Sequence, residues 1–198
     1  MAVEHRISEE AYQQFVLSGA GKGWELHEGR LVEKPGMSWE HGDIVMELAY
    51  LLRHQLDRTE YRVFVESRVR RPTATIFLPD VMVVPTSYGE PFRGRPGTLA
   101  IFSDPVPLIV EVWPSSTGDY DVDARLPIYQ QRGDLEIWRI HPYERTLTDW
   151  RRQPDGRYEE TIHRNGIVTP VALPGWKSTS KHCSTTDARS LDGRVATD

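Results

Sequence analysis

Two carboxylates stand out because each is set in an otherwise apolar segment. Glu111 lies in the segment 107–113 (PLIVEVW), and Asp80 lies in the segment 77–84 (FLPDVMVV). An ionised carboxylate inside an apolar strand is costly unless another group pairs with it. A shared divalent cation is the most economical way to keep both carboxylates ionised. The pattern therefore favours a metal site that contains Asp80 and Glu111.

An alternative explanation needs no metal. Asp80 follows Pro79 and can be a turn residue, while Glu111 can pair with an arginine. On the residues alone, both explanations stay open. Other chemistries have less support, since the chain has no His-x-x-x-His pair, no Gly-x-Ser-x-Gly elbow and no Walker loop.

Each carboxylate needs a strand to position it. Leu108, Ile109 and Val110 form an unbroken apolar run, which is typical of a strand buried on both faces, and Pro114 ends that strand. The segments 61–70 and 77–84 are predicted as further strands. A helix should follow Glu111, capped within 115–117, and end near Gly133. Pro127 should lie in its first turn or at a kink.

The N-terminal part predicts a helix over 7–18 capped by Ser8, and then a hairpin around Glu28-Gly29. The clearest helix runs from Trp39 to about Asp57 behind the cap Ser38. Its apolar stripe shares one face with a histidine at its N-terminal end (His41, Ile44, Val45, Leu48, Leu52, Leu56).

The C-terminal part predicts a long surface loop over 85–104, with a short helical piece near 99–102. Strands should follow over 135–140, 146–151, 158–162 and 167–173. We predict an α/β fold of the α+β mixed-sheet kind, with helices on both sides of a central mixed sheet and the carboxylates in adjacent central strands. Residues 1–176 should form one domain, and residues 177–198 a disordered C-terminal tail.

Composition limits the class of protein. The chain has 198 residues, a formal net charge of −5 and a single cysteine, Cys183. No apolar run approaches the ~20 residues that span a bilayer, and the N-terminus lacks a signal sequence, so we expect a cytoplasmic protein without membrane contact. The acidic charge argues mildly against strong non-specific DNA binding, although local arginine stripes can act within an acidic chain (68–71, Arg93, Arg95, Arg151, Arg152).

The chain resembles the Uma-two family of restriction-endonuclease-like proteins, a bacterial group within the PD-(D/E)XK nuclease superfamily. The matching pieces occur in order between residues 24 and 176: 24–29 (WELHEG), Glu40-His41, 79–84 (PDVMVV), 110–117 (VEVWPSST), 121–129, 133–142 and 173–176 (LPGW). The resemblance implies a restriction-endonuclease-like core. It also implies an enzyme that hydrolyses phosphodiester bonds of DNA with Mg²⁺ or Mn²⁺, which Asp80 and Glu111 would hold. We also consider a homodimer.

The resemblance implies auxiliary roles for His41 and Glu25, which match positions that recur in the family. His41 would bridge a phosphate or order a metal-bound water. The alternative is a hydrogen-bonded histidine at the edge of the core.

The superfamily lysine, usually two residues after the glutamate, is Trp113 here. Many family members carry a lysine on the following helix, where this chain has Arg125. No lysine lies between Lys34 and Lys177, so no local route supplies one. Arginine can stabilise phosphate charge but cannot accept a proton.

Arg125 is therefore the third predicted catalytic residue, and we expect its truncation to leave the fold almost unchanged. The alternative is that Arg125 is an ordinary surface residue on its helix. Tyr129 shares its helix face and should be a packing residue. The missing lysine keeps a second class of function open, a catalytically silent nuclease-fold module that binds DNA or a protein.

Overall fold

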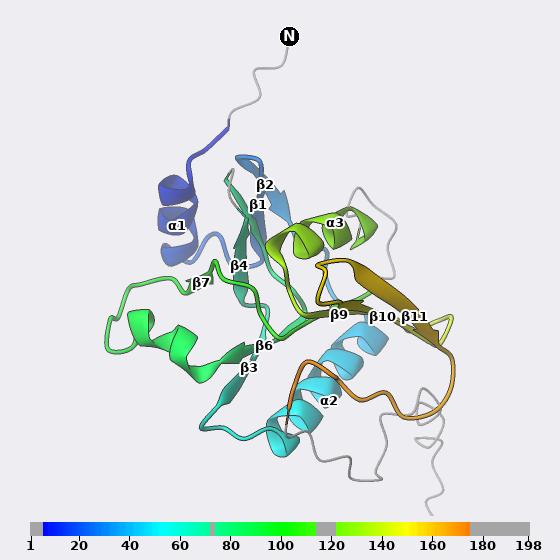
Figure 1. Ribbon diagram of the computed structural model, residues 1–198. Coiled ribbons are helices and arrows are strands. Elements are labelled where there is room, and N and C mark those ends of the chain that lie inside the picture. The colour runs from blue at the N-terminus through cyan, green and yellow to red at the C-terminus, as the bar shows by residue number, and fades with distance from the viewer. Residues whose placement is uncertain (1–5, 72–73, 114–121, 175–198) are drawn as a thin grey trace, which may run out of the picture.

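The computed structural model describes residues 6–71, 74–113 and 122–174 (Figure 1). Helices and strands alternate irregularly along the chain. Their bounds are α1 Glu9–Leu17, β1 Trp24–His27, β2 Arg30–Glu33, α2 Trp39–Gln55, β3 Tyr61–Val65, β4 Arg68–Arg71, β5 Thr75–Phe77, β6 Val81–Pro85, the 3₁₀ helix η1 Thr86–Phe92, β7 Ile101–Phe102, β8 Leu108–Val112, α3 Val122–Arg132, β9 Glu136–His141, β10 Thr146–Arg152 and β11 Tyr158–His163.

The strands form two mixed sheets. The five-stranded sheet has the order β2-β1-β5-β4-β7, and the six-stranded sheet has the order β11-β10-β9-β8-β6-β3. The pairs β4–β7 and β8–β9 are parallel, and the other pairs are antiparallel. The predicted mixed α/β architecture, the N-terminal hairpin and the C-terminal antiparallel strands are confirmed, but the central sheet is divided in two.

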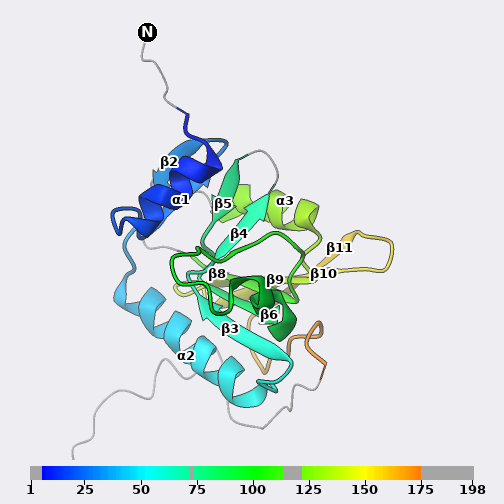
Figure 2. The same ribbon diagram turned by 90° about the vertical axis from the view of Figure 1, so that its left-hand side faces the viewer.

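The six-stranded sheet carries a helix on each face (Figures 1 and 2). Alternate residues of a strand point to opposite faces. Val81, Val83 and Val110 pack in the cluster that contains the apolar stripe of α2, whereas Met82 and Ile109 pack in the cluster that contains α3. The β6 and β8 strands are thus buried on both faces, as their continuous apolar runs predict.

Two predicted strands are broken where the chain passes from one sheet to the other. The segment 77–84 divides into β5 and β6 at Pro79, which has no N–H for a strand ladder. The segment 61–70 divides into β3 and β4 near Glu66, whose φ of 49° lies in the left-handed region. We call residues 78–80, which join β5 of one sheet to β6 of the other, the sheet junction.

The helices agree closely with the prediction. Ser8 caps α1 through the Ala11 N–H, and Ser38 caps α2 through the His41 N–H. Pro127 lies in the interior of α3 rather than in its first turn. Gly133 follows α3 with φ 82°, a conformation that glycine adopts without steric cost.

Four predictions differ from the structure or fall outside it. The segment 85–104 is not a plain loop, since it holds η1 and the strand β7, which pairs with β4. The segment 167–173 forms no strand, although Val168 and Leu173 are buried against α2 and the sheet, where a chain segment lies beside α2 in Figure 1. The predicted cap within 115–117 and the tail 177–198 lie outside the described residues.

The helices of the described residues differ in length and in apolar content from those that span a bilayer. None of them is both long enough and apolar enough to cross one.

A candidate active site at the sheet junction

Asp80 is the last residue of the sheet junction and is buried. Its Oδ1 accepts hydrogen bonds from Lys34 Nζ at 2.6 Å and His41 Nε2 at 3.0 Å, and its Oδ2 accepts one from Val112 N at 2.7 Å. The antiparallel register of β6 with β8, continued by one residue, places Asp80 opposite Glu111. The two carboxylates of the apolar strands are therefore neighbours, as the sequence predicts.

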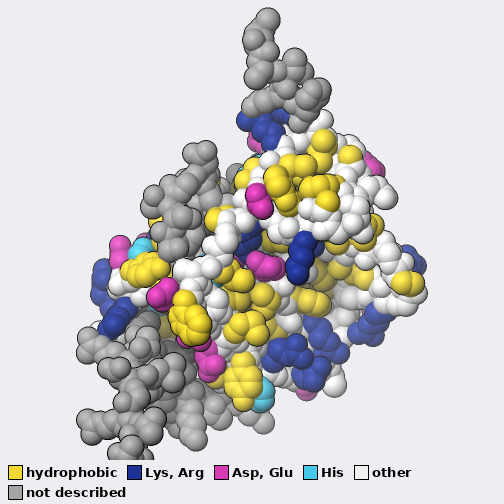
Figure 3. Space-filling model, turned by 180° about the vertical axis from the view of Figure 1, so that it is seen from behind, with side chains coloured by type: hydrophobic (Ala, Val, Ile, Leu, Met, Phe, Trp, Pro, Cys, Tyr) yellow, Lys and Arg dark blue, Asp and Glu magenta, His cyan; other side chains and the backbone are white. Residues whose placement is uncertain are grey.

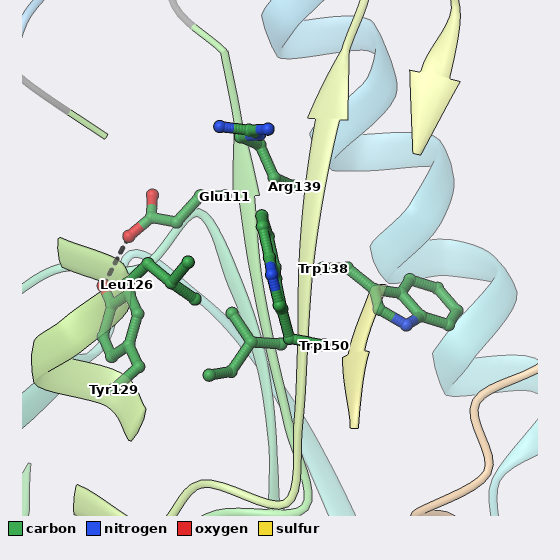
Figure 4. Close-up of a pocket in the computed structure, with 7 residues that line it drawn as sticks. Glu111, Leu126, Tyr129, Trp138, Arg139 and Trp150 are labelled. Atoms are coloured by element: carbon green, nitrogen blue, oxygen red, sulfur yellow. Dashed lines mark hydrogen bonds between the residues drawn. The ribbon is translucent and has the colours of Figure 1, made fainter. Parts of the chain in front are cut away.

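Glu111 is held by two residues of α3. Its Oε1 accepts hydrogen bonds from Arg125 Nη1 at 2.9 Å and from the Tyr129 hydroxyl. Arg125 and Tyr129 are four residues apart and so share one face of the helix. The other carboxylate oxygen of Glu111 points away from Tyr129 (Figure 4).

Glu25 on β1 completes the site from the five-stranded sheet. Its Oε1 accepts a hydrogen bond from Leu78 N at 2.7 Å, and its Oε2 contacts both Arg125 Nη2 and His27 Nε2, the latter at 2.9 Å. Arg125 therefore bridges Glu25 and Glu111, and its guanidinium carbon lies 5.0 Å from the centre of the Phe77 ring.

Lys34 enters the site directly after β2. Its side chain is 5% exposed and donates to the Leu78 carbonyl at 3.0 Å as well as to Asp80. The Glu66 carboxylate lies 3.5 Å from Nζ and is 33% exposed. The N-terminal hairpin and Lys34 directly after it therefore hold both backbone groups of Leu78. Glu25 accepts a hydrogen bond from the Leu78 N–H, and Lys34 donates one to the Leu78 carbonyl.

The buried charged groups of the site shift one another's pKa values. Burial by itself would raise the pKa of Asp80, but the hydrogen bond from His41 and the charge of Lys34 outweigh it and lower that pKa to about 2. Burial raises the pKa of Glu111; the charge of Arg125 lowers this pKa, and the charge of Asp80 raises it further. Burial would lower the pKa of Lys34, but the charges of Asp80 and Glu111 raise it. Asp80 is therefore ionised and Lys34 is an ammonium at neutral pH.

All five residues singled out in the sequence converge here. Asp80, Glu111, Arg125, His41 and Glu25 are buried and are joined to one another directly or through Lys34 and Leu78. Their chemical roles stay predictions. The metal-free alternative also described true features, since Asp80 does lie in a bend after a proline and Glu111 does pair with an arginine.

Sequence reasoning missed two members of the site. Lys34 lies 46 positions before Asp80, so no local motif links them, and the only sequence signal was the scarcity of lysine. Tyr129 was assigned to packing. It is buried, and its hydroxyl also donates to Glu111.

The donor set fits a hard divalent cation only in part. Carboxylate oxygens of Asp80 and Glu111 are suitable ligands for Mg²⁺, which usually keeps several waters. Within residues 6–71, 74–113 and 122–174, however, no group of three or more His, Cys, Asp or Glu residues is arranged to hold a metal. Oδ1 of Asp80 is also engaged by Lys34 and His41. Two carboxylates with water as the remaining ligand is the arrangement that these residues can offer.

A small hollow lies beside Glu111 on the α3 face of the sheet (Figure 4). Its walls are mostly aromatic and apolar, with one arginine (Glu111, Leu126, Tyr129, Ile137, Trp138, Arg139, Trp150). The guanidinium carbon of Arg139 lies 5.1 Å from the centre of the Trp150 ring and 5.7 Å from the centre of the Trp113 ring. Trp113, two residues after Glu111, stacks on His141.

Comparisons with known proteins agree with this fold. A family model named Uma2, described as "Putative restriction endonuclease", matches residues 9–182. The match covers most of the chain, and the protein belongs to this family. Family membership supports a nuclease function. No curated protein matches the chain.

A solved structure shares the fold. The structure of "a putative nuclease belonging to DUF820" from Anabaena variabilis superposes with a TM-score of 0.64 at 21% sequence identity. The alignment covers 83% of this chain and 88% of the other. The restriction-endonuclease-like architecture expected from the sequence is thereby supported.

Proposed function

We propose that the protein is a Mg²⁺- or Mn²⁺-dependent endonuclease that hydrolyses phosphodiester bonds of DNA. The observation that carries the proposal is the register of β6 and β8, which sets Asp80 opposite Glu111, with a cationic side chain against each carboxylate. Family membership supports the reaction class. A group of Lys and Arg side chains on the face shown in Figure 3 offers contacts for a polyanion.

Asp80 and Glu111 would hold the cation. The bound cation would supply charge stabilisation for the phosphate and a water of lowered pKa. In the net reaction, the water oxygen forms a bond to phosphorus while the bond from phosphorus to one ester oxygen breaks. The water loses a proton to solvent, and the departing oxygen takes one from solvent.

The remaining residues keep the two carboxylates in place. His41 and the Val112 N–H orient Asp80, while Arg125 and Tyr129 orient Glu111. The Arg125 guanidinium also adds positive charge beside the position where phosphate charge increases during attack.

A catalytically silent module that binds DNA or a protein is the second candidate. It is favoured by the two ion pairs, because Lys34 already compensates Asp80 and Arg125 already compensates Glu111. In such a module the charges would serve the fold, and cleavage would be absent.

Plasmid digestion separates the two candidates. Wild type should cleave DNA in Mg²⁺ or Mn²⁺, and Asp80→Asn should abolish cleavage, whereas Glu144→Gln, at an exposed acid, should not. Equal digestion by wild type and Asp80→Asn on supercoiled, linear and single-stranded DNA would favour the silent module.

Calorimetry tests the metal site separately from cleavage. Wild type should bind Mg²⁺ or Mn²⁺, gain thermal stability from it, and lose both effects in Glu111→Ala. Equal binding by wild type and Glu111→Ala would show that Glu111 is no ligand.

A further inference from the structure

We propose that Lys34, brought in by the N-terminal hairpin, is the catalytic lysine of this site and donates to the phosphate group under attack. This assignment rests on the proposed endonuclease function. It gives the third catalytic role to a residue of the five-stranded sheet rather than to Arg125 on α3.

The position of Lys34 is the first argument. Its Nζ lies 2.6 Å from Oδ1 of Asp80, one of the two carboxylates that would hold the cation. A phosphate oxygen bound to that cation would lie within the reach of the same ammonium group, because both contact one carboxylate. Among the described residues, no other lysine forms an ion pair with Asp80.

The three donors of the ammonium group give the second argument. Two are used by strong acceptors, Asp80 Oδ1 at 2.6 Å and the Leu78 carbonyl at 3.0 Å. The third faces Glu66 at 3.5 Å, a distance too long for a strong charge-assisted hydrogen bond. Glu66 is 33% exposed, and we expect a phosphate oxygen to replace this carboxylate as the partner of the third donor.

Arg125 is less able to fill this role. Its two terminal nitrogens are engaged by Glu111 and Glu25, and its guanidinium lies against the Phe77 ring. The side chain is 2% exposed. Arg125 therefore acts as a positioning residue between two carboxylates, while Lys34 keeps a donor for substrate.

Three variants test the assignment. Lys34→Met removes the ammonium group, and Lys34→Gln removes its charge but keeps a donor for Leu78. Lys22→Met is the matched control, because Lys22 is an exposed lysine that precedes the same hairpin. Each protein is checked for folding by thermal denaturation, for Mg²⁺ and Mn²⁺ binding by calorimetry, and for cleavage of plasmid DNA at saturating DNA concentration.

We expect both Lys34 variants to lose about a hundredfold in kcat with little change in KM, as for removal of one donor to the developing charge. Both should still bind Mn²⁺, and more tightly than wild type, because the competing ammonium group is gone. Lys22→Met should behave as wild type.

The contrary outcomes are distinct. Unchanged kcat in Lys34→Met, beside an active wild type, overturns the role of Lys34 and leaves the endonuclease function intact. Loss of cation binding in Lys34→Gln, or its failure to fold, makes the ammonium group a structural partner of Asp80 and overturns the assignment. A wild type no more active than Asp80→Asn overturns both proposals together.

Discussion

Arg125 shows how burial raises the cost of truncating a charged side chain. The sequence suggested that this residue could be truncated at little cost to the fold. In the structure it lies between Glu25 and Glu111 and is almost fully buried. Truncation would leave two buried carboxylates without their shared cation, which is far more costly than the loss of an exposed ion pair.

We therefore predict that Arg125→Ala lowers the free energy of unfolding by about 3–5 kcal/mol. Arg125→Lys should lose less stability and retain cleavage or increase it, because a lysine keeps the charge. Urea denaturation and plasmid cleavage measure the two effects. Arg157→Ala, at a side chain that is 87% exposed, is the control and should leave stability unchanged. An Arg125→Ala protein as stable as wild type would contradict this account of the bridge.

Tyr129 offers a smaller change at the same carboxylate. Tyr129→Phe keeps the ring but removes the hydroxyl that donates to Glu111. We predict a loss of about 1–3 kcal/mol in stability, the range for a buried acceptor that loses its donor. Cleavage should also fall, because Glu111 is less well oriented. Tyr158→Phe removes a hydroxyl that donates to the Asp134 carbonyl, away from the site, and should leave cleavage unchanged. Equal cleavage by the two variants would show that Tyr129 serves only in packing.

Local sequence predicted Asp80 and Glu111 but not Lys34. Asp80 and Glu111 could be found because each interrupts an apolar strand, and the cost of burying a charge is a local property. Lys34 could not be found this way, since its contact with Asp80 depends on how the hairpin packs against the sheet junction. An isolated lysine after a strand is an ordinary surface residue until that packing is known.

At the scale of elements, the N-terminus of α2 positions one member of the site. Ser38 caps this helix through the backbone N–H of His41, whose ring contacts Asp80. We predict that Ser38→Ala costs about 0.5–2 kcal/mol, as for other N-caps, and also weakens cleavage.

Ser8→Ala provides the matched control, because Ser8 caps α1 in the same way. It should cost a similar amount of stability without any effect on cleavage at equal folded fraction. If both variants reduce cleavage equally, the effect comes from stability and not from the position of His41.

Strands were predictable as extended segments but not as members of a particular sheet. The alternation in 61–70 and the apolar run in 77–84 both indicated extended structure correctly. Each segment nevertheless contributes to both sheets, through breaks at Glu66 and Pro79. Periodicity describes which face is buried, whereas the change of sheet depends on one left-handed residue and one missing N–H.

At the scale of the whole molecule, the described core ends at residue 174 with Leu173 buried against it. The sequence beyond Trp176 lacks apolar periodicity, so we predict that deletion of residues 180–198 changes the melting temperature little. Calorimetry of the full chain and the truncated chain measures this. A drop of many degrees would show that this segment packs on the core.

The double contact of the hairpin with Leu78 has a consequence for the speed of unfolding. Its two hydrogen bonds join residues 44 and 53 positions apart, so each closes a long loop. Long loops close late in folding, after more local pairings have formed. Contacts absent from the transition state mainly slow unfolding. Glu25→Gln should therefore raise the unfolding rate constant and leave the refolding rate constant unchanged. Glu33→Gln should alter neither rate constant. The charged groups around the sheet junction would then set the lifetime of the native fold as well as its chemistry.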